Sequence, residues 1–208
     1  MLDFIQRLRD QLTRQLPGED AQFQMAPMKR LRMREALAAA PEVRQSAVLL
    51  YFFPKRDDWY IVLMKRPDYD GTHSGQVGIP GGRLEAGESH LQAALREFEE
   101  EIGIAVDGSN LLGKLSDLFI PPSNYLVQPY VAYSLESPYY VPDPVEVEEV
   151  IELSATWLLN RSAIKRGKVR LNSGVVIESP YFEVAGHTVW GATAMILSEL
   201  KQILRAVG

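Results

Sequence analysis

The segment over residues 82–104 constrains this chain more than any other part of the sequence. It reads GRLEAGESHLQAALREFEEEIGI and joins a glycine-containing loop to a helix-forming stretch in which charged residues recur at fixed intervals. Ser89 and Gln92 match a capping box, and Gly103 stands where a left-handed C-terminal cap is expected. The spacing therefore predicts a helix over residues 89–102.

Two faces of this expected helix differ in character. Apolar residues recur at three- and four-residue steps and predict a stripe that packs on the core. These residues are Leu91, Leu95, Phe98 and Ile102. Glu97 and Glu101 lie on a different face, and Glu100 is three residues from Glu97. Carboxylates at these spacings repel one another. Because hard divalent cations such as Mg²⁺ prefer oxygen ligands, this face predicts a metal site.

A run of glutamates has a second interpretation, because most acidic helix surfaces are simply solvated. The preceding loop favours the metal site. Gly78, Pro80, Gly81 and Gly82 make a turn whose backbone can approach a ligand closely, and an exposed carbonyl there could join the carboxylates at the metal. The loop and the helix together therefore form one composite signal.

Arg96 and Glu88 each allow two interpretations. A mutual ion pair would fix the loop on the helix, whereas a catalytic role would place either side chain at the reacting group. We favour the structural interpretation for Arg96 and leave both open for Glu88.

The residues described so far match the Nudix box, G-x5-E-x7-R-E-U-x-E-E-x-G-U, at every defined position, so the chain resembles the Nudix hydrolases. The resemblance implies an α/β/α sandwich with a mixed β-sheet, in which the box forms a loop and a helix. It also implies Mg²⁺ or Mn²⁺ as cofactor and cleavage of a diphosphate linked to a nucleoside. Glu97 and Glu101 resemble the family's principal metal ligands, and Glu100 resembles a third. The catalytic group expected from the box comprises these three glutamates and Arg96.

An acidic cluster outside the box offers a further candidate. Asp143, Glu146, Glu148 and Glu149 lie close together in the sequence, and one of them could be the general base or an additional metal ligand. We select Glu146 as the first candidate. The alternative is a solvated loop, since exposed charge runs are usually only solvating.

Residues 62–82 give information about the substrate. They read VLMKRPDYDGTHSGQVGIPGG and resemble the additional signature of the coenzyme A pyrophosphatase branch, L-L-T-x-R-S-x3-R-x3-G-x-V-x-F-P-G-G. The agreement is partial. Gly71 occupies the place of the second arginine, so any contact of that arginine with the substrate's phosphates must be absent or supplied by another group, such as His73 or Lys65. The matching residues are Leu63, Arg66, Gly75, Val77, Pro80, Gly81 and Gly82. The substrate-binding residues that the resemblance implies are Arg66, His73, Gly81 and Gly82.

Two of the residues that this resemblance covers have alternative roles. The guanidinium of Arg66 suits phosphate oxygens, but Arg66 could equally be a surface cation that anchors Asp68 or Asp70. Trp190 lies in a late segment that also resembles coenzyme A pyrophosphatases. We interpret it as a core residue, because buried aromatic residues usually serve packing.

Three functions follow. The first is hydrolysis of coenzyme A or acyl-coenzyme A to 3′,5′-ADP and 4′-phosphopantetheine or its acyl form. The second is hydrolysis of ADP-ribose or another nucleoside diphosphate derivative by the same Nudix box, an alternative that Gly71 favours. The third is a non-catalytic nucleotide-binding regulator, for which a degenerate box would be expected, whereas this box is intact.

Composition limits the partners and the location. There are 22 Lys and Arg against 27 Asp and Glu, giving a net charge of −5, whereas nucleic-acid-binding proteins usually show the opposite balance. No cysteine is present, which agrees with a reducing cytoplasm. Without a targeting signal or an 18-residue apolar run, membrane association is not expected. We therefore expect a cytoplasmic enzyme of a small nucleotide substrate, and the resemblance leaves a homodimer open.

The rest of the chain predicts an N-terminal helical extension and linker over residues 1–40 and a Nudix domain over 41–208. Helices are expected at 2–16, with a linker at 17–27, and at 28–40, 154–159 and 188–204. Strands are expected at 47–53, 59–64, 111–119, 126–134 and 148–153, with two more between 168 and 184.

Overall fold

A mixed β-sheet forms the centre of the molecule. The computed structural model describes residues 2–28, 30–69, 74–171 and 174–208. Strand β1 (Arg44–Lys55) is central, because it pairs parallel with β7 (Tyr125–Tyr133) and antiparallel with β2 (Asp58–Lys65). The eight-stranded sheet has the order β3-β2-β1-β7-β5, and β4, β6 and β8 pair with β1, β7 and β2 respectively. These shorter strands are β3 (Val77–Gly78), β4 (Gly81–Arg83), β5 (Leu111–Lys114), β6 (Leu118–Ile120) and β8 (Glu149–Ser154).

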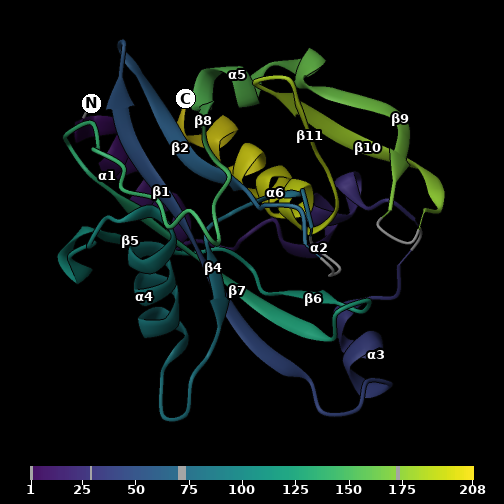
Figure 1. The fold of residues 1–208 in the computed structure, drawn as a ribbon. Coiled ribbons are helices and arrows are strands. Elements are labelled where there is room, and N and C mark those ends of the chain that lie inside the picture. Colours follow the sequence, from purple (N-terminus) through teal and green to yellow (C-terminus); the bar gives the residue numbers. More distant parts are fainter. Residues whose placement is uncertain (1, 29, 70–73, 172–173) are drawn as a thin grey trace.

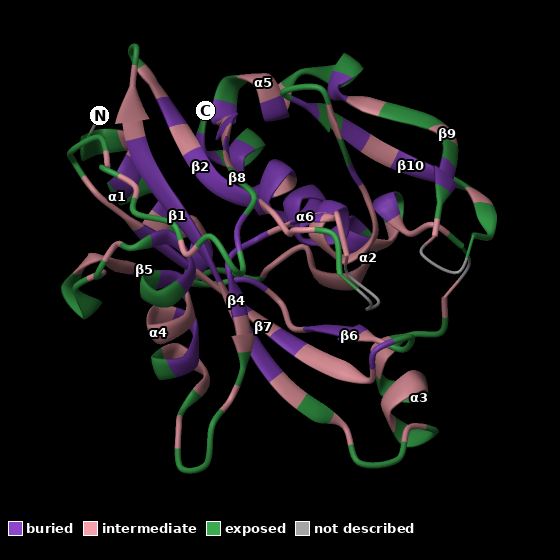
Figure 2. Ribbon diagram, viewed as in Figure 1, coloured by how far each residue is buried: buried purple, intermediate pink, exposed green. Residues whose placement is uncertain are grey.

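Helices cover both faces of this sheet (Figure 1). Alternate side chains of β1 point to opposite faces, as the strand period requires. Leu49, Tyr51 and Phe53 pack toward α4 (His90–Ile102), whereas Leu50 and Phe52 belong to a second core with α1 (Leu2–Leu12) and α6 (Gly191–Val207). Strands β1 and β2 are accordingly buried over most of their length (Figure 2). The expected α/β/α sandwich with a mixed sheet is confirmed.

A second, antiparallel sheet was only partly predicted. It has the order β11-β10-β9 and consists of β9 (Ile164–Arg170), β10 (Val176–Val184) and β11 (His187–Val189). The sequence predicted two strands, but the third is only three residues long and leaves little pattern to recognise. Because β11 packs beside β3, this sheet lies next to the glycine-rich loop that precedes the box (Figure 1).

The N-terminal extension packs closely on the rest of the fold. Helix α1 buries Ile5, Leu8 and Leu12, and the ring of Phe4 stacks on Trp59 with centroids 5.5 Å apart. The linker expected at 17–27 is wrong, because this segment forms α2 (Gly18–Gln22) and a 3₁₀ turn with buried side chains. That turn is η1 (Phe23–Met25). The Gly18 amide and the Gln22 side chain donate hydrogen bonds to the buried Glu199, which hold α2 on α6. The division into domains at residue 41 stays a prediction.

Other boundaries differ from the expected ones. The helix expected at 28–40 is confined to α3 (Met33–Ala38), and α6 starts after Trp190. The strand expected at 111–119 is divided into β5 and β6, with a register irregularity at Gly113. Helix α5 is Ala155–Leu159, and two further 3₁₀ turns are η2 (Gly108–Asn110) and η3 (Arg161–Ala163). In the described part of the chain, no helix combines the length and the apolar character needed to cross a membrane.

Candidate metal centre

Helix α4 presents the box glutamates from a well-defined segment. Ser89 accepts a hydrogen bond from the Gln92 amide, and the Gln92 side chain accepts one from the Ser89 amide, so the predicted capping box is confirmed. Gly103 ends the helix with φ of 78°, in the left-handed region, and donates to the Glu99 carbonyl. Both ends of the helix are therefore fixed by local sequence, and its rotation sets the direction of each glutamate.

Glu101 is the buried member of the site. Glu101 is only 1% exposed, because it lies beside Phe98 and Ile102 on the inner face of the helix. One carboxylate oxygen accepts from the Arg66 guanidinium at 3.0 Å, and the other accepts from the backbone amide of Gly81 at 2.7 Å. Burial raises the pKa of Glu101 to about 7, against the lowering effects of Arg66 and of the Gly81 amide.

Glu97 lies one turn earlier and is half-buried. Its carboxylate sits against Gly82, where a Cβ atom would come within 2.3 Å of a Glu97 oxygen. A side chain at position 82 would therefore displace the carboxylate. Burial raises the pKa of Glu97, whereas the hydrogen bond from Arg96 lowers it.

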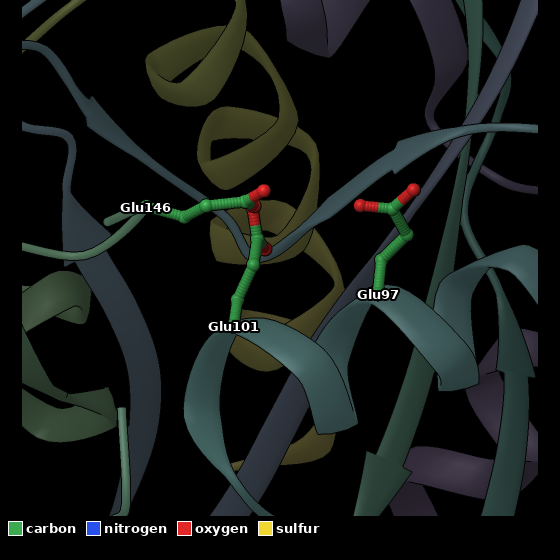
Figure 3. A group of neighbouring side chains, drawn as sticks. All are labelled: Glu97, Glu101 and Glu146. Carbon is green, nitrogen blue, oxygen red and sulfur yellow. The ribbon is translucent and has the colours of Figure 1, made fainter. Parts of the chain in front are cut away.

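Glu146 completes the cluster from a different part of the chain. It lies in the loop before β8, and this loop is joined to the end of α4 because the Asp143 amide donates to the Glu101 carbonyl at 3.1 Å. Glu97, Glu101 and Glu146 each offer an oxygen atom, and these atoms lie within 4.8 Å of one another. Figure 3 shows the Glu146 carboxylate beside that of Glu101, with Glu97 on the adjacent turn.

Glu100, expected as a third ligand, is not part of this cluster. Its side chain is 59% exposed and pairs with Arg96 at 2.9 Å. The metal-binding role of Glu100 therefore stays a prediction, while Glu146 is the third carboxylate that the structure brings to Glu97 and Glu101.

Arg96 connects the loop to the helix. Two of its nitrogens bind the two oxygens of Glu88 at 2.9 and 3.0 Å, and another contacts Glu97 at 3.0 Å. It also donates to the Arg83 carbonyl. The ion pair expected between Arg96 and Glu88 is thus confirmed. It lowers the pKa of the Glu88 carboxyl and raises that of Arg96.

Of the expected substrate-binding residues, Arg66, Gly81 and Gly82 lie in the described part of the chain, whereas His73 does not. Arg66 points into the site, where it binds Glu101 and the Gly81 carbonyl, and no ion pair joins it to Asp68 among the described residues. Gly81 has a φ of 145° and lies so close to β1 that a Cβ atom would come within 2.3 Å of the Ala47 carbonyl oxygen. His73 and Gly71, together with Asp70, lie outside the described residues.

Sequence reasoning missed one functional group, the Gly81 amide that donates to Glu101. The signal was present in the Pro-Gly-Gly run, because a glycine lets the backbone approach another group closely. The sequence also gave no indication of the ion pair between Lys65 and Glu148, whose charged atoms lie 2.6 Å apart.

The donor set fits a hard divalent cation. Three carboxylates face one another, and repulsion from Glu97 and Glu146 contributes to the raised pKa of Glu101. Like charges held together in this way are stabilised by a cation, and oxygen donors suit Mg²⁺, Mn²⁺ and Ca²⁺. Arg66 and Arg96 supply only part of the compensating charge.

Comparison with known proteins agrees with the fold and identifies the family. The model of the NUDIX domain family matches residues 43–174, and the chain therefore belongs to the Nudix hydrolases, which generally require divalent metal ions. The chain is similar to "Mitochondrial coenzyme A diphosphatase NUDT8" of Homo sapiens, with 29% identity over 187 residues that cover 84% of this chain and 72% of that protein.

Two further comparisons concern length and fold. The chain is 30% identical over 139 residues to "Probable nudix hydrolase C6G9.05" of Schizosaccharomyces pombe; the match covers 66% of this chain but only 48% of that protein. A solved structure of a MutT/nudix family protein from Enterococcus faecalis shares the fold, with a TM-score of 0.54 and 14% identity. That match covers 93% of this chain and 76% of the other.

Proposed function

We propose that this chain hydrolyses the diphosphate bond of coenzyme A or its thioesters with the help of a divalent cation. The products would be 3′,5′-ADP and 4′-phosphopantetheine or its acyl form. The observation that carries the proposal is the cluster of Glu97, Glu101 and Glu146 beside the glycine-rich loop. The partial coenzyme A signature over residues 62–82 and the name of the human relative support the choice of substrate.

Glu97 and Glu101 would hold Mg²⁺ or Mn²⁺, with Glu146 or the expected Glu100 as a further ligand. When bound, such an ion neutralises diphosphate oxygens and lowers the pKa of a coordinated water. Few cationic side chains of the chain lie at this site. A bound metal ion would therefore neutralise both the acidic side chains and the anionic substrate.

Other residues of the chain prepare the site. Arg66 holds one oxygen of Glu101 and the Gly81 amide holds the other, so this carboxylate has a fixed orientation. We propose that Arg66 also donates to a phosphate oxygen, for which its planar guanidinium is suited. Arg96 positions Glu97 and the loop at Glu88.

We propose Glu146 as the general base, because its exposed carboxylate lies at the solvent side of the cluster. It would accept a proton from the attacking water as the water oxygen bonds to one phosphorus and the bond from that phosphorus to the bridging oxygen breaks. The bridging oxygen then leaves with the bonding electron pair on the other product, and the attacked phosphate keeps the water oxygen.

A second candidate is a diphosphatase of ADP-ribose or another nucleoside diphosphate derivative. It is favoured by Gly71, which replaces an arginine of the coenzyme A signature. The third hypothesis, a regulator that binds nucleotides without turnover, gains no support from an intact box.

Product analysis separates these functions. The purified protein is incubated with coenzyme A, acetyl-coenzyme A or ADP-ribose in the presence of Mg²⁺ or Mn²⁺, and the products are resolved by chromatography. Release of 3′,5′-ADP from the two coenzyme A substrates is expected. Preferential cleavage of ADP-ribose would establish the second candidate, and absence of turnover with every substrate and metal would favour the third. The cytoplasmic location and a homodimer stay predictions.

A further inference from the structure

A groove lies between the loop before the box and the second β-sheet. It has a volume of about 260 Å³ and is open to solvent. The second sheet contributes residues from β9 and β11, and the loop contributes the segment that enters β3. The lining residues used below are Gln76, Lys168, Arg170, His187 and Trp190.

The charge of this groove is opposite to that of the metal centre. Lys168 and Arg170 are two residues apart on β9, so their side chains leave the same face of the strand. Both are exposed, and neither forms an ion pair with a carboxylate among the described residues, although Glu178 lies opposite Lys168 on β10. None of the described residues that line the groove is acidic. In a chain with a net charge of −5, this is a surface suited to an anion.

The groove also offers an aromatic surface. Trp190 was expected in the core, but it is only partly buried, and it lines the groove just before α6 begins. An indole ring next to cations suits a nucleobase that carries a phosphate nearby, because the base can stack while the phosphate is neutralised.

Two sets of contacts run from the groove toward Arg66, whose side chain binds the metal centre at Glu101. The amide of Arg66 donates to the carbonyl of Gln76 at 3.0 Å, and the Arg66 side chain binds Glu101. On the other side, His187 contacts Glu149 at 3.0 Å, and Glu149 is the strand partner of Lys65 in β2. Arg66 therefore contacts both a glutamate of the cluster and the segment that lines the groove, so the two sites are neighbours.

We propose that this groove binds the 3′-phosphoadenosine end of the substrate, with Lys168 and Arg170 contacting the 3′-phosphate and Trp190 contacting the adenine. The proposal rests on the proposed function, since it assigns the part of coenzyme A that does not react. It explains how a chain that lacks one arginine of the signature could still select a 3′-phosphorylated nucleotide. Dephospho-coenzyme A and ADP-ribose lack this phosphate, so the groove would discriminate against both.

The first test compares coenzyme A with dephospho-coenzyme A. The measured quantity is the ratio of their kcat/KM values, determined for the wild type and for the double variant Lys168→Ala/Arg170→Ala. Loss of charge-assisted hydrogen bonds to one phosphate should lower this ratio about tenfold, mainly through the KM of coenzyme A. An unchanged ratio would overturn the proposal, even if both substrates were cleaved more slowly.

Lys165→Ala is the matched control. Lys165 lies on the same strand and is exposed, but it pairs with Glu183 and does not line the groove. It removes the same kind of charge, so its ratio should equal that of the wild type. Circular dichroism and thermal unfolding confirm that the variants are folded.

A binding measurement keeps the two proposals distinguishable. Calorimetry compares 3′,5′-ADP with 5′-AMP, which needs no turnover. The wild type should bind 3′,5′-ADP more tightly, and the double variant should lose the preference. If the wild type shows this preference without cleaving coenzyme A, the groove stands and the proposed function fails. If it cleaves coenzyme A but binds both nucleotides equally, only the groove fails.

Discussion

Two buried glutamates occupy opposite faces of the central sheet and have different surroundings. Glu101 on α4 is 1% exposed, and Glu199 on α6 is fully buried. Glu199 accepts hydrogen bonds from the Gly18 amide, the Ser116 amide and the Gln22 side chain, all of them neutral donors. Glu101 accepts from Arg66 and one amide, and its neighbours Glu97 and Glu146 are also acidic.

The difference shows that burial of a carboxylate does not by itself indicate function. Around Glu199 the donors come from two distant segments, α2 and the loop at Ser116, so the carboxylate fixes the N-terminal extension to the fold. Around Glu101 the carboxylate oxygens outnumber the hydrogen-bond donors. A bound cation would compensate the remaining negative charge. The same substitution at the two positions should therefore have different consequences.

The largest effect is expected for Glu101→Gln. Loss of a charged ligand should lower kcat/KM by about 10³-fold, because stabilisation of the charged transition state is lost. The fold should be retained, as judged by circular dichroism. Glu99→Gln on the exposed face of α4 is the control and should keep wild-type turnover. Comparable activity in both variants would contradict the assignment of Glu101.

The pH dependence of stability should reveal the raised pKa of the buried Glu101 carboxyl. In the folded state its pKa is raised from 4.5 to about 7, so the folded protein binds this proton more tightly than the unfolded chain. Stability should consequently fall as pH rises from 4.5 toward 7, with a contribution of about 3 kcal/mol. Urea unfolding in EDTA at several pH values measures it. The Glu101→Gln variant should lack this contribution, and identical pH profiles would refute it.

Glu199→Gln should affect stability and leave the chemistry alone. The new amide group would face N–H donors, so the free energy of unfolding should fall by about 2 kcal/mol. Urea unfolding at constant pH gives this value. Turnover per folded molecule should stay within about twofold of wild type. A large loss of turnover in the folded variant would mean that the two regions are coupled more closely than the comparison implies.

The smallest effect is expected for Arg66→Lys, which keeps the positive charge beside Glu101 but loses the planar guanidinium. Misplacement of a group that orients a ligand typically costs about 10-fold or more in affinity or activity. We expect a decrease in kcat/KM of about this size and weaker binding of Mn²⁺, measured by calorimetry. Wild-type values for both would mean that the contact of Arg66 with Glu101 orients neither the carboxylate nor the ion.

The sequence predicted those parts of the site that depend on local geometry. Ser89, Gln92 and Gly103 set the ends of α4, and helical pitch then places Glu97 and Glu101 on adjacent turns. Pitch alone could not separate Glu100 from the cluster, because that requires knowing how the helix is rotated on the sheet. The inner face includes Ala94 and Glu101, a rotation that the leucine-based stripe did not predict.

Features that depend on distant contacts were beyond the sequence. Glu146 was selected from a charge run, but its approach to Glu101 depends on backbone hydrogen bonds between the loop and the end of α4. The structured segment after Pro17 was missed because its polar residues resemble a linker, whereas Gln22 is buried against Glu199. The role of β9 and β11 in forming a groove likewise requires the packing of β11 beside β3.

The attachment of the 141–143 segment to α4 has a consequence for motion. The amides of Val141 and Asp143 bind the carbonyls of Ile102 and Glu101, and Gly103 leaves room for the Val141 carbonyl. The final helical turn and the loop that carries Glu146 are thereby tied together. Fraying of that turn would release the loop, so hydrogen exchange at the Asp143 amide reports how often the third carboxylate departs.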